Sequence, residues 1–122
     1  MIDVFIAKQP KDRCVIVKVE GHAHTAPVGQ DTVCAAVSIL VYGCFTEISE
    51  LDEARFHERM VFIGDEKTGD AYLYLRCKES RTYDRVLYNI APMERAIEML
   101  AERYPSDVSL PANNLIMSPN GR

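Results

Sequence analysis

The sequence predicts an α+β fold in which an antiparallel sheet packs against two long helices, with elements in the order ββαββαβ. Short segments with alternating apolar residues favour strands that have one buried face. Two longer segments carry apolar residues at three- and four-residue spacings, which is the period of an α-helix. A chain of 122 residues has about the length of one domain. We assign it to residues 1–110 and expect residues 111–122 to form a loosely held tail.

The first two predicted strands form a β-hairpin. Apolar residues occupy alternate positions in both segments, and a turn-like stretch at residues 9–12 separates them. The alternating residues are Ile2, Val4 and Ile6 in the first segment and Val15, Val17 and Val19 in the second.

A long apolar helix is predicted over residues 32–51. Asp31 is a good N-cap residue for it. Apolar residues lie nearly all round its first half, which indicates burial against the sheet on one side and against another element or subunit on the other. The apolar run at residues 33–45 is broken by a serine and a glycine and is shorter than the ~20 residues of a bilayer span. We therefore expect a buried helix and no membrane partner.

Two further strands are predicted after this helix. The first covers residues 60–63, and its extension back toward His57 stays open. The second covers residues 71–77. The connection between them is rich in turn-forming residues, which favours an antiparallel pair.

The last predicted elements are an amphipathic helix and a short strand. The helix covers residues 83–104, and Pro105 ends it. We expect Pro92 to kink or divide this helix, because proline removes a hydrogen-bond donor and clashes with the preceding turn. Val108 and Leu110 are the apolar positions of the final strand.

Composition and charge limit the partners of the chain. The formal net charge is -4 at pH 7, and the 14 Lys and Arg residues are interspersed with 18 Asp and Glu residues. Phosphate binding along a nucleic acid needs a basic stripe, so we predict no direct nucleic-acid partner. A basic polypeptide suits this charge better. The N-terminus lacks the pattern of a secretory signal, which predicts a cytoplasmic protein.

The four cysteines include no CxxC pair, which argues against a zinc ribbon or a thioredoxin-type site. We expect free thiols, with Cys14, Cys44 and Cys77 packed as small buried hydrophobes. Cys34 differs, because with Asp31 as N-cap it is the third helical residue and lies near N–H groups that have no intrahelical partner. Those groups and the helix dipole lower the pKa of a thiol, although the Asp31 carboxylate opposes the effect.

His22 directly follows the second predicted strand. The eleven residues between His22 and Cys34 are enough to fold back and bring the imidazole to the sulfur. An imidazolium is the second environment that lowers the pKa of a thiol. The pair is therefore a candidate catalytic dyad, although the spacing alone also fits two residues that carry no chemistry.

The residues around this pair resemble the signature GHA…G.D.VCAAVS of the ribosomal-processing cysteine protease family, Prp. The matching positions, with the same number of residues between His and Cys, are Gly21-His22-Ala23, Gly29, Asp31 and residues 33–38. The resemblance implies that Cys34 is the nucleophile and His22 its general base. It also implies a protein substrate: a short apolar N-terminal extension on the twenty-seventh protein of the large ribosomal subunit, whose removal is needed for ribosome assembly.

Other residues near the pair have supporting roles or structural alternatives. Asp31 either orients His22 or is a plain helix cap, and Ser38 hydrogen-bonds either the Cys34 sulfur or a helix carbonyl. We expect the free N–H groups at the helix start to stabilise the oxyanion. In the family the loop that here covers residues 23–30 is thought to be mobile, so that substrate entry orders the site. His24 is a second imidazole, and we favour His22 because it fills the motif position.

Three alternatives remain at this point. The first is a zinc site, whose ligands would be of types that zinc accepts: His22, His24, Cys34 and Asp31. The protease chemistry, in contrast, needs no metal or other cofactor. A non-enzymatic binding module is the second. The third is a protease that acts on a phage capsid or scaffold protein with a similar apolar site. The resemblance and the apolar helix together predict a homodimer.

Overall fold

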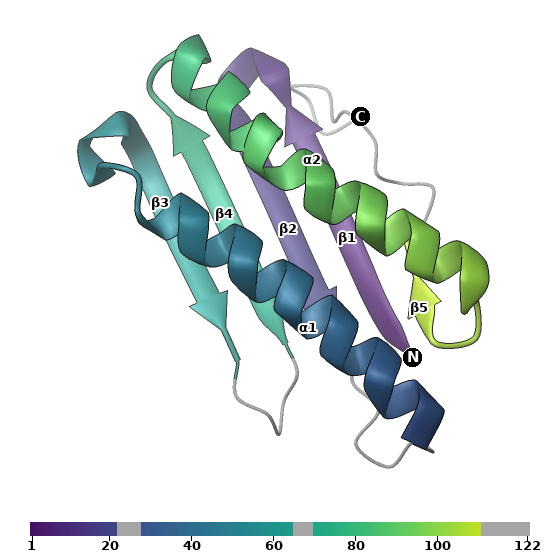
Figure 1. Cartoon of the computed structure of the whole chain (residues 1–122). Coiled ribbons are helices and arrows are strands. Elements are labelled where there is room, and N and C mark those ends of the chain that lie inside the picture. Colours follow the sequence, from purple (N-terminus) through teal and green to yellow (C-terminus); the bar gives the residue numbers. More distant parts are fainter. Residues whose placement is uncertain (22–27, 65–69, 111–122) are drawn as a thin grey trace.

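The computed structural model describes residues 1–21, 28–64 and 70–110, with only the backbone described for residues 28–31. It confirms the α+β class and the order ββαββαβ (Figure 1). The elements are β1 (Ile2–Gln9), β2 (Cys14–Glu20), α1 (Val28–Ser49), β3 (Phe56–Ile63), β4 (Ala71–Cys77), α2 (Ser80–Arg103) and β5 (Val108–Ser109), with 3-10 turns η1 (Pro10–Asp12) and η2 (Glu53–Arg55).

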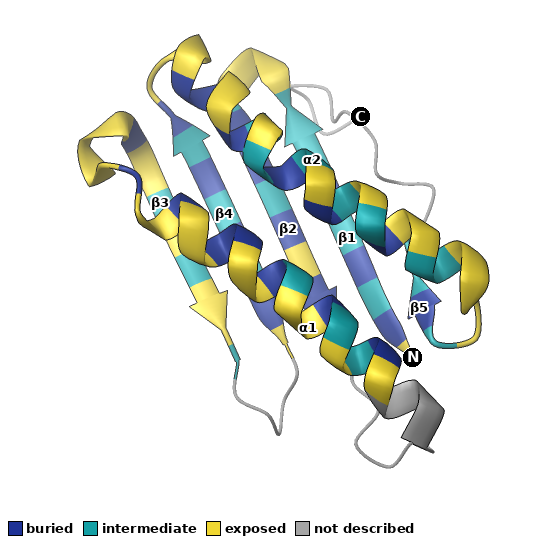
Figure 2. Ribbon diagram, in the orientation of Figure 1, coloured by how far each residue is buried: buried dark blue, intermediate teal, exposed yellow. Residues whose placement is uncertain are grey.

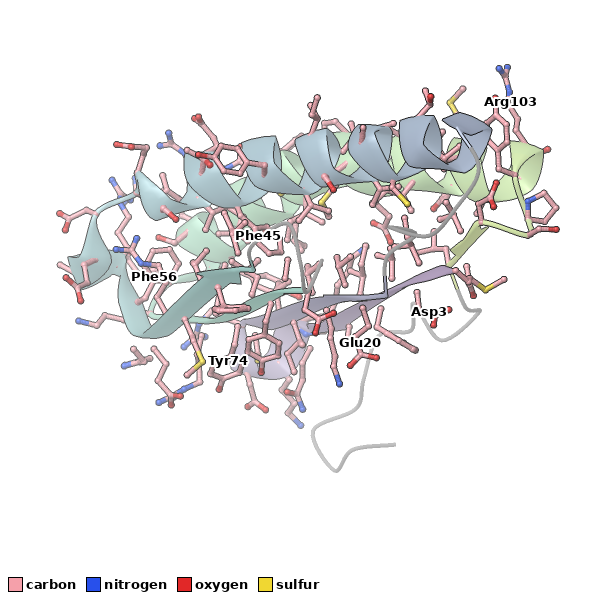
Figure 3. All side chains as sticks on the ribbon, turned by 90° about the horizontal axis from the view of Figure 1, so that it is seen from below. Asp3, Glu20, Phe45, Phe56, Tyr74 and Arg103 are labelled. Carbon is pink, nitrogen blue, oxygen red and sulfur yellow. The ribbon has the colours of Figure 1, made fainter. Side chains whose placement is uncertain are left out.

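The five described strands form one sheet in the order β3-β4-β2-β1-β5. The predicted hairpin is confirmed, because β1 and β2 pair antiparallel from Asp3↔Glu20 to Gln9↔Cys14. β2 and β3 each pair antiparallel with β4. The two-residue strand β5 departs from this pattern, since it lies parallel to β1 and makes the sheet mixed. Both helices cover the same face of the sheet (Figures 1 and 3).

The hydrophobic core lies between the helices and this face of the sheet. Side chains alternate between buried and partly exposed along β1 and β4 (Figure 2), which is the two-residue period of a strand with one covered face. Phe45 of α1 is fully buried against the sheet, while Tyr74 lies on the opposite, open face (Figure 3). On that open face Met60 and Phe62 of β3 are 57% and 52% exposed.

Helix α1 begins at Val28, earlier than the predicted residue 32, and ends at Ser49. Its window Thr32–Ser49 has the length and composition of a helix that could cross a membrane. Val37, Phe45 and Ile48 on its inner side are buried in the core, at no more than 2% exposure.

The far end of α1 is held by Arg59 of β3. The Arg59 Nη1 atom donates to the carbonyl oxygens of Leu51, at 2.6 Å, and of Ile48, at 3.5 Å. A cation near the carbonyl end of a helix satisfies unpaired acceptors and interacts favourably with the dipole. The Arg59 guanidinium also lies 5.1 Å from the centre of the Phe56 ring. This contact fixes α1 against the sheet.

Pro92 does not divide α2, which runs without a break from Ser80 to Arg103. The carbonyl that loses its helical partner is that of Tyr88, four residues earlier. Tyr88 is 81% exposed and Pro92 is also exposed. Water can therefore bond the Tyr88 carbonyl, which explains why the helix tolerates the proline.

Candidate active site

Cys34 lies at the boundary between the core and the surface. It is the seventh residue of α1, which begins at Val28. Val33 and Val37 point into the core with 4% and 2% exposure, whereas Ala35 is exposed. Cys34 itself is half-buried and packs against the core. A thiol in this position is held by packing and still has one side open to a substrate.

The prediction that Asp31 caps α1 is wrong, because the helix begins at Val28 and Asp31 lies inside it. The unpaired N–H groups therefore belong to residues 28–31, one turn before Cys34. The Cα–Cβ bond of a helical residue tilts toward the N-terminus, so the Cys34 side chain leans toward that first turn. The dipole effect falls off within the first turn. The helix dipole therefore acts on Cys34 more weakly than the sequence indicated.

The other three thiols are buried, which confirms their predicted packing role. Burial raises the pKa of Cys44 to about 11, and the Cys44 Sγ atom lies 3.6 Å from the carbonyl oxygen of Asn89. Burial also raises the pKa of Cys77 to about 11. The pKa of Cys14 is raised chiefly by burial, although a hydrogen bond with Tyr74 opposes the shift. Thiols with raised pKa values are poor nucleophiles at neutral pH.

The chain that leads to His22 is anchored at Gly21. Gly21 has φ +90°, and a Cβ there would collide with the carbonyl oxygen of Met1. Only glycine fits this close approach in the left-handed region. The Gly21 N–H donates to Asp70 Oδ1 at 3.3 Å. The end of β2 is therefore fixed, and it lies at the same end of the sheet as the start of α1 (Figure 1).

Several predicted site residues fall outside the part of the chain that is described. His22 and His24 lie in residues 22–27, and the side chain of Asp31 is not described. The zinc alternative needs these side chains, which lie outside the described residues. Ser38 is exposed, and within the described residues its hydroxyl makes no hydrogen bond with Cys34 or a helix carbonyl. Residues 28–30 belong to α1, so the connection from β2 is shorter than predicted.

Asp70 is a residue of this region that sequence analysis missed. It anchors Gly21 from the residue before β4, although 49 positions separate the two residues in the sequence. No local pattern marks such a contact. The glycine itself was part of the recognised motif, but its positive φ and its approach to Met1 become visible only in the structure.

The two-layer α+β domain carries one half-buried thiol near the start of an apolar helix, which is the partial exposure that the nucleophile of a cysteine protease needs. The family model described as cysteine protease Prp matches residues 1–109. The chain belongs to this family. The match confirms the prediction of a cysteine protease over that of a non-enzymatic binding module.

Solved structures share the fold. A Staphylococcus aureus structure described as an essential ribosomal processing protease Prp in complex with a substrate peptide is 22% identical, with a TM-score of 0.68, 91% of this chain covered and 98% of that one. The same protease with a covalently linked product peptide is 23% identical with a TM-score of 0.64, and the match covers 90% of this chain and 97% of that one. A Streptococcus mutans protein is 22% identical with a TM-score of 0.65, and the match covers 97% of this chain and 95% of that one. The chain has no match among curated proteins.

Proposed function

We propose that this protease is an endopeptidase with a Cys34–His22 dyad. The single observation that carries the assignment to Cys34 is its exposure: of the four cysteines, it alone is not buried. It also occupies the position of the cysteine in the family signature. His22 directly follows Gly21, whose N–H donates to Asp70 Oδ1, so the proposed base is attached to an anchored end of β2.

The proposed reaction proceeds in two stages. His22 takes the Cys34 thiol proton as the sulfur attacks the scissile carbonyl, and the resulting imidazolium then protonates the leaving amine. The acyl group remains on Cys34 as a thioester. Water, activated by the neutral imidazole, then releases the new carboxylic acid and restores the thiol.

The first turn of α1 is the proposed source of oxyanion donors. Its unpaired N–H groups belong to residues 28–31. The Cys34 side chain leans toward these groups, because helical side chains tilt toward the N-terminus. Donors of this kind stabilise the tetrahedral intermediate most strongly when they are fixed before the substrate arrives.

The proposed substrate is the N-terminal extension of the twenty-seventh protein of the large ribosomal subunit, cleaved in the cytoplasm during ribosome assembly. Membership of the Prp family supports this assignment. The Staphylococcus aureus relative is described as a ribosomal processing protease bound to a substrate peptide. The acidic net charge of -4 suits a basic protein substrate.

Cleavage of two peptides by the full chain tests both the substrate and the dyad. One peptide carries the ribosomal extension, and the other carries the apolar site of a phage capsid or scaffold protein. We expect the ribosomal peptide to be cut at one site, read by mass, and His22→Ala to abolish cleavage while His24→Ala does not. Preference for the phage peptide would overturn the substrate, and loss of cleavage only in His24→Ala would overturn the base.

We also propose that the protein forms a homodimer through the outer face of α1. Ile39 and Tyr42 on this face are 73% and 59% exposed, and a Cβ built on Gly43 would meet no atom within 4 Å. Large exposed apolar side chains beside a small residue are typical of a helix that another chain approaches closely. Light scattering should give the mass of a dimer, and Ile39→Glu should give that of a monomer. A monomeric wild-type protein would contradict the proposal.

A further inference from the structure

A polar cavity of about 380 Å³ lies at the end of the sheet opposite to the anchored end of β2. It opens beside η1 and the starts of β2 and β3, and Tyr74 and Arg76 of β4 contribute to its wall. The proposed protease chemistry uses none of these residues. The volume is within the range of small-molecule sites, which is roughly 300–1,000 Å³.

Two arginines in this cavity are held in place by the protein. Arg13 has a φ of 54°, and its Nε atom donates to the carbonyl oxygen of Cys77 at 3.2 Å. This single bond leaves both Nη groups of Arg13 without a partner among the described residues. Arg76 bonds Glu58 through Nε and Nη2, at 3.2 and 3.1 Å. Its Nη1 group keeps two N–H donors available.

The remaining wall adds positive charge and few acceptors. Lys11 of η1 and the exposed His57 also line the cavity, and Asp12 is its one carboxylate. The formal charge of this region is +1, because it has three cations (Lys11, Arg13 and Arg76) and two carboxylates (Asp12 and the neighbouring Glu58). The whole chain, in contrast, carries -4.

The cavity contains two ionisable groups that stay neutral. Cys14 and Tyr74 form a hydrogen bond with each other, and burial is the largest cause that raises the pKa of each. Neither group therefore adds negative charge near neutral pH. The cavity thus presents fixed guanidinium donors over an uncharged thiol and phenol.

We propose that this cavity binds a phosphate group, either as free phosphate or as part of a small phosphorylated molecule. Guanidinium groups bind phosphate oxygens through paired, charge-assisted hydrogen bonds. Side chains already held in position lose little entropy when the ligand binds. The cavity wall includes neither Cys34 nor His22, so a failure of the proposed reaction would not affect this proposal.

The test is an NMR titration of the full chain with inorganic phosphate at constant pH and ionic strength. The chain has three histidines, and His57 alone lines the cavity, so its imidazole signals report binding while those of His22 and His24 act as internal controls. We expect a saturable shift of the His57 signals. Arg13→Gln should weaken binding about tenfold or more, because it removes charge-assisted bonds.

Two further variants keep the test decisive. Lys11→Gln removes a second cation of the cavity and should also weaken binding, whether or not Arg13→Gln folds. Lys78→Gln is the matched control, because Lys78 is exposed and close in sequence but outside the cavity wall. It should change the affinity less than about twofold. No saturable His57 shift, or equal weakening in the Lys11 and Lys78 variants, would overturn the proposal.

A parallel titration with adenosine monophosphate distinguishes the two sources of the phosphate. Tighter binding than that of inorganic phosphate indicates a phosphorylated molecule, which Tyr74 and the open face of the sheet would contact beyond the phosphate. Equal affinity indicates free phosphate as the ligand. In both cases Arg13→Gln must weaken binding, and an unchanged affinity in that variant contradicts the site.

Discussion

Cys34 and Cys44 lie on the same helix, yet Cys34 is half-buried whereas Cys44 is buried in the core. Cys44 is 8% exposed, and burial raises its pKa to about 11. Cys34 is half-buried at the edge of the core, at the end of the sheet where β2 is anchored. The residue type is identical in the two places. We therefore expect the reactivity of each cysteine to follow its exposure and its neighbours.

The two halves of α1 also differ in how they are held. The second half contains Phe45 and Ile48, both with 0% exposure, and Arg59 bonds the carbonyls at its end. The first half carries Cys34 and the exposed Ala35 beside the start of the helix. The thiol in the first half of α1 is therefore more accessible than the thiol of Cys44 in the second half.

The largest expected effect is that of Cys34→Ala on peptide cleavage. Loss of the nucleophile should lower kcat/KM more than about a thousandfold. The free energy of unfolding should change by less than about 1 kcal/mol, because Cys34 is only half-buried. Cys44→Ala is the matched control, and it should keep its activity while losing stability. An inactive, folded Cys44→Ala beside an active Cys34→Ala would reverse the comparison.

Phe45→Ala should produce the largest loss of stability. Its ring is fully buried between α1 and the sheet, and truncation leaves a cavity. We expect the free energy of unfolding in urea to fall by about 3–5 kcal/mol. Ile39→Ala on the same helix should change the monomer by less than about 0.5 kcal/mol, because Ile39 is 73% exposed. Equal losses in the two variants would mean that α1 packs through a different face.

The buried thiols should make stability fall at high pH. The pKa of Cys44 is 9.0 for a free thiol and about 11 in the folded protein. Its stabilising contribution is therefore complete below pH 9.0 and is lost as the pH rises toward about 11, because the unfolded chain releases the proton first.

The difference in free energy of unfolding between wild type and Cys44→Ala isolates this contribution. It should shrink by on the order of 2 kcal/mol over that interval. A difference that does not change with pH would show that the Cys44 thiol ionises equally in both states.

Arg59→Met should destabilise the protein less than Phe45→Ala does. It removes the donor to the carbonyls of Leu51 and Ile48 and the cation beside the Phe56 ring. We expect a loss of about 1–2 kcal/mol in the free energy of unfolding. Arg55→Met is a suitable control, because Arg55 is exposed and its side chain bonds no described residue. An equal loss there would indicate a general charge effect.

Local patterns predicted most of the fold. The alternating residues of β1 and β2 and the bounds of β4 agree with the structure. The start of α1 was misplaced because Asp31 is a preferred cap residue, yet it lies inside the helix. A capping preference is a weak signal, because the same residue type also occurs within helices.

The sequence contained less information about the surroundings of the site. The family signature singles out Cys34, and the structure shows that it is the one cysteine that is not buried. The bond from Gly21 to Asp70 and the bond from Arg59 to Leu51 join separate elements across the fold. Such contacts depend on how strands and helices pack, so no local period predicts them.

The most direct test of the central claim is the rate at which iodoacetamide alkylates each cysteine in the native protein at neutral pH, read by mass mapping. Cys34 should react first and should do so together with the loss of peptide cleavage. Cys44 and Cys77 should react only when the protein unfolds, because both are buried in the core. Cys14 lines the polar cavity but is buried, and burial raises its pKa, so it should react much more slowly than Cys34. Labelling of Cys34 that is no faster than that of the three buried thiols would contradict its role as the nucleophile.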